Sequence, residues 1–326
     1  MAHPIHQANE NSPFGELTRE EFYNKHQVLH QESFMSNKQN MKIFTQSWQP
    51  AAGSSLRLIG LIAMVHGYTD ESSWLIQLNA VSFAKAGFYV CALDLQGHGY
   101  SEGSRGHIPR IEPVVEDCIQ LFDSARAAHP KLPAFLFGES LGGAISILIS
   151  LKQSKAWSGV ILNAAMCGVS KKFKPVWPLE ELLPVVAFVA PTWKVAITDD
   201  PVNKSYKEEW KRKLVMKSPN RLPNSKVTAA TALEFLRVCG YIQRNSHLLE
   251  LPLLMVHGGE DKVCDPESAK LVYESVASKD KTLNIFKGMW HQFIGEPNDS
   301  VDLVFEMILS WISDRASKDK TNANDI

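Results

Sequence analysis

The sequence lacks the excess of positive charge that a nucleic-acid-binding protein needs. Its 326 residues carry 34 lysines and arginines against 35 aspartates and glutamates, a formal net charge of −1. Proteins that capture phosphate backbones depend on a basic surface, so we expect no nucleic acid as a partner. The most basic stretch, KEEWKRK at 207–213, contains two glutamates and is better interpreted as a solvated helix face.

Cysteine and long apolar runs are also scarce. The five cysteines are odd in number, widely spaced and contain no CxxC pair, which indicates reduced thiols and neither a zinc site nor a disulfide framework. The N-terminal MAHPIHQANENSPFGEL has no apolar signal-peptide core. No uncharged apolar run reaches the ~18 residues of a membrane helix. These absences predict a cytoplasmic protein.

What the sequence does contain is an alternation of apolar strands and amphipathic helices. After a hairpin at 32–50, predicted strands at 56–65, 88–95, 134–137 and 158–164 are separated by helical patterns. The alternation resumes with strands at 251–258 and 281–288, and a final helix follows. Such alternation is typical of an α/β fold with a mostly parallel central sheet and helices on both faces. A cap at Ser72 or Ser73 is expected for the helix that Gly87 ends.

The alternation breaks between residues 164 and 248, which hold seven of the seventeen prolines. We interpret 1–163 and 249–316 as the two parts of one core domain, and 164–248 as a helical cap inserted between them. Residues 317–326 form a polar tail that we expect to fray. Because the insertion separates two sheet strands, it should emerge at the carboxyl edge of the sheet, where open α/β folds bind ligands.

One serine stands between glycines at the end of a predicted strand. AFLFGESLGGAIS, residues 134–146, places Ser140 in a G-x-S-x-G pattern between strand and helix. In such a turn the serine hydroxyl is exposed at the sheet edge, and the next N–H group, from Leu141, points into the same space at a helix N-terminus. An ordinary strand–helix turn of small residues is the alternative. No lysine follows Gly143, so a phosphate-binding P-loop is set aside.

A serine hydroxyl is a weak nucleophile unless a base accepts its proton. His291 follows the last predicted strand and should therefore lie at the same sheet edge as Ser140. His66 and His257 also end strands, but each precedes a glycine, and we favour a role in shaping the turn. His98 and His107 are weaker candidates.

The base in turn needs a carboxylate that holds its tautomer. Asp261 lies in the turn after the strand that ends at Gly258, whereas Asp265 precedes a proline and is explained by helix capping. Glu260 and Asp94 remain alternatives. For the oxyanion, Gly67 lets the chain turn sharply after an early strand, so the N–H of Tyr68 is the expected second donor beside that of Leu141.

With these residues in place, the chain resembles the α/β-hydrolase superfamily, and within it the plant monoacylglycerol lipase and caffeoylshikimate esterase group. The resemblance rests on MVHGYTDESSW, ALDLQGHGYSEGSRGHIP, FLFGESLGGA, VHGGEDKVCDP and SKDKTLNIFKGMWH, which stand in the family's order between about Glu32 and Ala316. It implies an α/β-hydrolase fold with a mobile cap and ester cleavage without metal or organic cofactor. It also implies Ser140, Asp261 and His291 as the triad, with Tyr68 and Leu141 as oxyanion donors.

Two stretches depart from the group's pattern. The chain has Thr-Asp-Glu after Tyr68, where the esterases of the group tend to have Gly-Asn-Asp, and a tryptophan and a glutamine flank His291, where methionine or serine is more usual. Both departures adjoin the expected pocket and therefore bear on the choice of substrate more than on the chemistry.

The predicted function is hydrolysis of a carboxylic ester, a monoacylglycerol or a related lipid or phenolic ester, through an acyl-enzyme on Ser140. Trp177 and Trp193 in the cap are candidate substrate-binding residues, although packing of the cap onto the sheet explains either one as well. Contact of the apolar stretch 182–193 with a membrane surface is a further option. The alternatives are acyl transfer to an alcohol by the same triad, and a non-catalytic ligand-binding protein of this fold. The oligomeric state is not predicted.

Overall fold

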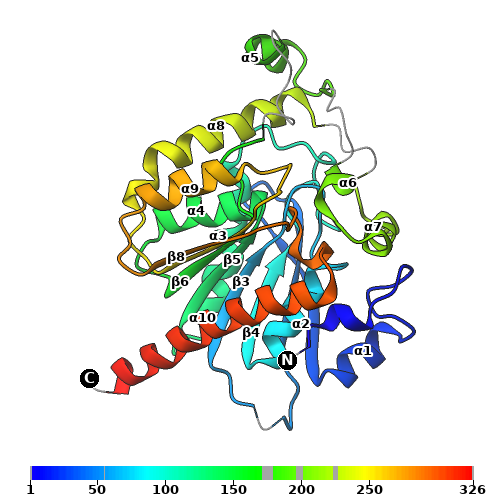
Figure 1. Cartoon of the computed structure of the whole chain (residues 1–326), viewed down its shortest axis with the longest axis vertical. Helices are drawn as coiled ribbons and strands as arrows, with labels where there is room; N and C mark the ends of the chain where they lie inside the picture. The colour runs from blue at the N-terminus through cyan, green and yellow to red at the C-terminus, as the bar shows by residue number, and fades with distance from the viewer. Residues whose placement is uncertain (1, 55, 171–178, 196–200, 223–226, 325–326) are drawn as a thin grey trace.

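An eight-stranded sheet forms the centre of the molecule (Figure 1). The computed structural model describes residues 2–54, 56–170, 179–195, 201–222 and 227–324. The strand order is β1-β2-β4-β3-β5-β6-β7-β8; β2 is antiparallel to both β1 and β4, and the other neighbours are parallel. The strands are β1 (Val28–Ser36), β2 (Lys42–Pro50), β3 (Gly60–Val65), β4 (Phe88–Leu93), β5 (Ala134–Glu139), β6 (Gly159–Asn163), β7 (Leu253–Gly258) and β8 (Lys281–Phe286).

Helices cover both faces of this sheet (Figure 1). On one face α3, α4, α8 and α9 enclose one apolar cluster, and on the other α2 and α10 enclose a second. The described α-helices are α1 (Arg19–Lys25), α2 (Ile76–Lys85), α3 (Glu112–Ala128), α4 (Leu141–Lys152), α5 (Leu179–Val189), α6 (Pro201–Ser205), α7 (Glu209–Met216), α8 (Ala229–Asn245), α9 (Pro266–Ser275) and α10 (Asn298–Asn324). Three short 3-10 helices are η1 (Pro4–Gln7), η2 (Ser246–Leu248) and η3 (Phe293–Gly295).

Strands β3, β5, β6 and β7 are mostly apolar because both of their faces are covered. Every residue of β3, β5, β6 and β7 is buried, as expected for parallel strands between two helical layers. Each large apolar side chain removed from water there contributes about 1.5–3 kcal/mol. The predicted α/β-hydrolase fold with a mostly parallel central sheet is confirmed.

The predicted serine cap of α2 is wrong. The residue that precedes the helix is Leu75, and it makes no side-chain capping bond. Ser72 instead donates its backbone N–H and its hydroxyl to Asp94 Oδ1, at 2.7 and 2.6 Å. The buried carboxylate of Asp94, in the loop after β4, therefore binds Ser72. The start of α2 has no side-chain cap and is stabilised by the packing of its buried residues.

The segment between β6 and β7 contains α5, α6, α7 and α8 (Figure 1). Helix α5 exposes Leu182, Val185, Phe188 and Val189, in the stretch for which the sequence suggests contact with a membrane surface; that contact stays a prediction. Among the described residues, none of the helices combines the length and apolarity needed to span a bilayer. At the C-terminus, α10 continues to Asn324, so most of the predicted polar tail is helical.

Part of this segment is joined to the loop that follows β8. Gln292 N–H donates to the Ser205 carbonyl at 2.9 Å, and the N–H groups of Lys207 and Glu208 donate to the Gly295 carbonyl at 3.1 and 2.9 Å. The fully buried Lys211 of α7 donates its ammonium to the Glu296 carbonyl at 2.5 Å. Helices α6 and α7 and the β8 loop therefore form one hydrogen-bonded unit.

Candidate active site

The backbone at the end of β5 holds Ser140 in an unusual conformation. Ser140 has φ 54° and ψ −117°, a combination that costs about 1–3 kcal/mol in a non-glycine residue. Its N–H donates to the Asn163 carbonyl at 3.0 Å, and its own carbonyl accepts from Met166 N–H at 2.9 Å. A Cβ added at Gly142 would lie 2.1 Å from the Val65 carbonyl oxygen. The glycine therefore lets the start of α4 approach β3 and so keeps the turn tight.

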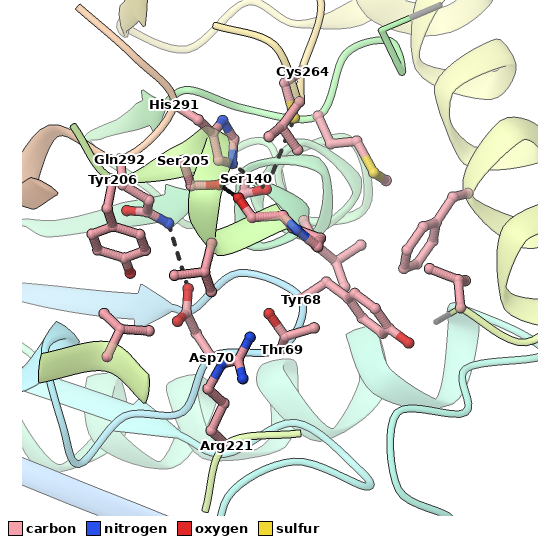
Figure 2. A pocket seen from close by; sticks show the side chains of 18 of the residues that line it. Tyr68, Thr69, Asp70, Ser140, Ser205, Tyr206, Arg221, Cys264, His291 and Gln292 are labelled. Carbon is pink, nitrogen blue, oxygen red and sulfur yellow. Dashed lines mark hydrogen bonds between the residues drawn. The ribbon is translucent and has the colours of Figure 1, made fainter. Parts of the chain in front are cut away.

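The three residues that the sequence assigns to nucleophile, base and acid lie in one hydrogen-bonded chain. Figure 2 shows the contact between Ser140 and His291. His291 Nε2 is 3.0 Å from Ser140 Oγ, and His291 Nδ1 is 2.7 Å from Asp261 Oδ2. All three residues are buried, with between 3% and 9% of each exposed. They follow β5, β7 and β8, whose carboxyl ends meet at one edge of the parallel sheet.

Asp261 also contacts a second histidine that the sequence interpretation assigned to turn shaping. His257 Nε2 lies 3.1 Å from Asp261 Oδ2, the same oxygen that faces His291. The other carboxylate oxygen accepts backbone N–H groups of Val263 and Cys264, at 2.8 and 3.0 Å. The only signal in the sequence was a histidine at a strand end, four residues before the aspartate.

The pKa values around this chain fit a base that is held by a carboxylate. Burial alone would raise the pKa of Asp261, but the two histidines and their hydrogen bonds outweigh it and hold that pKa below its usual range. Burial alone would lower the pKa of His291, but the Asp261 charge and hydrogen bond outweigh it and raise the pKa. Asp261 is therefore ionised at neutral pH, and His291 has gained affinity for a proton, as a general base needs.

The two predicted oxyanion donors are neighbours of Ser140 in one cavity. Tyr68 and Leu141 both line that cavity together with Ser140 and His291. The turn that carries Tyr68 is anchored by His66, whose Nδ1 lies 2.7 Å from the Gly67 carbonyl and whose Nε2 accepts Leu95 N–H at 3.0 Å. Burial lowers the pKa of His66 to about 4, so the imidazole is uncharged at neutral pH. Its two hydrogen bonds stabilise the turn, which is the role that the sequence interpretation favours for it.

Two of the alternative acids, Asp265 and Asp94, have other partners. Asp265 caps α9 by accepting Ser268 N–H at 3.1 Å, which agrees with the capping role expected for it. Asp94 accepts hydrogen bonds from the N–H and hydroxyl of Ser72, at 2.7 and 2.6 Å, and from the N–H of Tyr100 at 2.9 Å. Within the described ranges, no three His, Cys, Asp or Glu side chains gather in a way that could hold a metal ion.

The cavity has an apolar and a polar side. Helix α8 contributes Phe235 and Leu236 to the apolar side, with Met166, Val169 and Val227 nearby in the lining. Trp193 is 69% exposed and is not among the residues that line the cavity. Trp177, the other predicted substrate-binding residue, lies outside the described residues. Part of the apolar lining that the sequence interpretation missed comes from α8, an amphipathic helix between β6 and β7 whose buried residues recur at helical spacing in the sequence.

Comparisons with known proteins agree with this architecture. A family model described as "Serine aminopeptidase, S33" matches residues 57–298. The chain is 33% identical over 309 residues to caffeoylshikimate esterase of Arabidopsis thaliana, which covers 94% of this chain and 92% of that protein. It is 28% identical over 279 residues to monoglyceride lipase of Rattus norvegicus, with 86% and 89% covered.

Among solved structures, a soluble variant of monoglyceride lipase from Saccharomyces cerevisiae in complex with a substrate analog superposes with a TM-score of 0.76. That match is 18% identical and covers 87% of this chain and 94% of the other. At this level of identity the likeness concerns the fold alone.

Proposed function

This chain belongs to the serine aminopeptidase S33 family of α/β-hydrolases, in the group that includes caffeoylshikimate esterase and the monoglyceride lipases, and from that membership we propose that it hydrolyses carboxylic esters. The observation that carries the proposal is the hydrogen-bonded chain from Ser140 through His291 to Asp261 at the wall of a largely apolar cavity. A hydroxyl, an imidazole and a buried carboxylate at these distances supply a nucleophile, a base and an orienting group.

The proposed reaction has two acyl-transfer steps. His291 Nε2 accepts the Ser140 proton while Oγ attacks the ester carbonyl, and the N–H groups of Leu141 and Tyr68 donate to the oxyanion. The protonated His291 then donates to the departing alcohol oxygen, which leaves an acyl group on Ser140. Water, deprotonated by the same imidazole, releases the acid. Asp261 remains ionised and stabilises the imidazolium.

The cavity lining supports an ester whose acyl part is apolar. A fatty acyl chain or an aromatic acyl group would lie against the side formed by Met166, Val227 and Phe235. Names of relatives support both kinds of ester, because one acts on caffeoylshikimate and others on monoglycerides. We propose monoacylglycerols or related lipid or phenolic esters as the substrate class.

The test is labelling by a fluorophosphonate, which reacts with activated serines, followed by hydrolysis assays. We expect labelling and ester hydrolysis in the native chain and loss of both in Ser140→Ala. Ser205→Ala is the matched control, because Ser205 also lines the cavity but donates its hydroxyl to the Pro201 carbonyl at 2.7 Å. Folded native protein that is not labelled would favour a binding protein, and ester products formed with an added alcohol would favour acyl transfer.

A further inference from the structure

A second imidazole faces the carboxylate of Asp261, and the proposed reaction gives it no role. His257 lies one position before the end of β7 and is 1% exposed. Its Nε2 is 3.1 Å from Asp261 Oδ2 and 3.4 Å from the Cys264 carbonyl oxygen. An ionised carboxylate and a carbonyl only accept hydrogen bonds, so this nitrogen has to carry a hydrogen. His257 therefore donates to the same oxygen that faces His291.

The carboxylate of Asp261 is surrounded by N–H groups on both of its oxygens. Oδ1 accepts those of Val263 and Cys264 at 2.8 and 3.0 Å. Oδ2 lies 2.7 Å from His291 Nδ1 and 3.1 Å from His257 Nε2. Burial raises the pKa of Asp261, but the charge of His291 and the hydrogen bonds from the two histidines outweigh it and hold that pKa below its usual range. Each donor that stabilises the ionised carboxylate reduces its affinity for a further proton. Asp261 therefore attracts the His291 proton less than it would without His257.

The two imidazoles are held by different parts of the fold. Strand β7 lies between β6 and β8, and His257 is paired with Ile285 of β8 in the register of the sheet. His291 lies in the loop after β8, which is hydrogen-bonded to the segment that contains α6 and α7. The strand therefore gives His257 a fixed place, from which its N–H sets the direction of Asp261 Oδ2. The loop that carries His291 meets a carboxylate that is already oriented.

We propose that His257 is a positioning residue that shares Asp261 Oδ2 with His291, fixes the direction of the carboxylate and limits how firmly it holds the imidazolium. The inference rests on the ester hydrolysis proposed above. In that reaction His291 accepts the Ser140 proton and then gives it to the departing alcohol oxygen. A carboxylate that held the imidazolium too firmly would favour the first transfer and slow the second. Sharing of the oxygen with His257 balances the two transfers.

A pair of variants at one position tests this role through the pH profile of kcat/KM for a soluble ester. His257→Met removes the donor, whereas His257→Gln keeps an N–H donor in a side chain of similar reach. Without the donor, Oδ2 serves His291 alone and the imidazolium becomes more stable. We expect the acidic limb to move to higher pH by about half a unit or more in His257→Met and to stay within about 0.2 unit of the native limb in His257→Gln. His26→Met is the control, because His26 is also a buried histidine but packs against Phe22 of α1 and does not line the cavity. It should leave the limb in place.

NMR titration of the histidine rings gives a second measurement that needs no hydrolysis. In the Ser140→Ala background the titration midpoint of His291 should rise when His257→Met is added, and in the native chain ¹⁵N shifts should show His257 with a hydrogen on Nε2.

Three results would overturn the proposal. One is an acidic limb and a His291 midpoint that stay in place in folded His257→Met, and another is an equal shift in His257→Gln. The third is a native His257 whose Nε2 carries no hydrogen, which decides the matter even if the methionine variant does not fold. Absence of ester hydrolysis together with absence of fluorophosphonate labelling of Ser140 in the native chain would instead overturn the proposed function, and this role with it.

Discussion

Replacement of Asp261 by asparagine probes the orientation of the proposed base. One oxygen of Asp261 accepts two backbone N–H groups and the other faces both His291 and His257. In Asp261→Asn the remaining oxygen keeps the backbone bonds, and an NH₂ group replaces the oxygen at the imidazoles. His291 Nδ1 must then accept a hydrogen bond, so its proton moves to Nε2, which faces Ser140 at 3.0 Å. An imidazole in that tautomer cannot accept the serine proton.

The expected loss is large because the wrong tautomer removes the base and the imidazolium loses its counter-charge. A carboxylate-to-amide change in such a triad lowers kcat by about 10⁴-fold, which corresponds to ~5.4 kcal/mol of activation free energy at 1.36 kcal/mol per decade. The fold should tolerate the change, since the amide has nearly the same volume and keeps the two backbone contacts. We expect a shift of about 1–2 kcal/mol in the free energy of unfolding.

The assay is the pH profile of kcat/KM for hydrolysis of a soluble ester. Because Asp261 raises the pKa of His291 above its ordinary value of 6.5, activity in the native chain should fall as the pH drops through a midpoint above 6.5. In Asp261→Asn the imidazolium is less stable, so the remaining activity should fall at a lower pH. His257→Gln, which leaves the His291 contact in place, is the comparison variant.

Two results would refute this reasoning. Activity of folded Asp261→Asn within tenfold of the native chain would mean that the carboxylate does not hold the base. An acidic limb that stays at the same pH in both proteins would mean that His291 is not the group that titrates.

Three further predictions concern packing and the insertion. Gly143→Val should lower the free energy of unfolding by about 1–3 kcal/mol in denaturant titration, because a Cβ there would lie 2.4 Å from Ala165 Cβ; an unchanged midpoint would contradict the close approach. Trp193→Ala should leave kcat/KM within about twofold, since this side chain is 69% exposed, and a tenfold loss would reinstate its predicted role. Burial lowers the pKa of Lys211 from 10.5 to about 8. Between pH 8 and pH 10.5 the unfolded chain therefore binds more protons at Lys211 than the folded chain does, so the contribution of Lys211 to the free energy of unfolding rises with pH over this range. That slope should be absent from Lys211→Met in thermal melts, and an identical slope in both proteins would count against the burial of the ammonium.

The sequence predicted those parts of the fold that depend on local pattern. The continuous apolar runs of β3 and β5 indicated strands covered on both faces, and the glycines around Ser140 indicated a tight turn. Because the carboxyl ends of parallel strands share an edge, the residues after β5, β7 and β8 could be placed together before any coordinates were known.

Contacts between particular side chains were beyond such reasoning. Three examples are the hydrogen bond from Ser72 to Asp94, the contact of His257 with Asp261 and the hydrogen bond from Gln292 to Asp70. Each of them depends on where the side chains point after packing. The sequence showed Gln292 only as a departure beside the histidine, and its partner lies 222 positions away. Strand periodicity gives no information on pairs of this kind.

The hydrogen-bonded unit of α6, α7 and the β8 loop sets a rule for building chimaeras of this chain. Consider a graft that replaces 164–248 as one block with the equivalent block of a relative. It would also exchange four residues that hydrogen-bond to the loop carrying His291: Ser205, Lys207, Glu208 and Lys211. Donor and recipient would then have to agree at every one of these contacts for the imidazole to keep its place. A graft confined to 179–195 and the residues after α7 leaves these contacts native. A graft that includes α6 and α7 should also include the loop after β8 from the same donor protein.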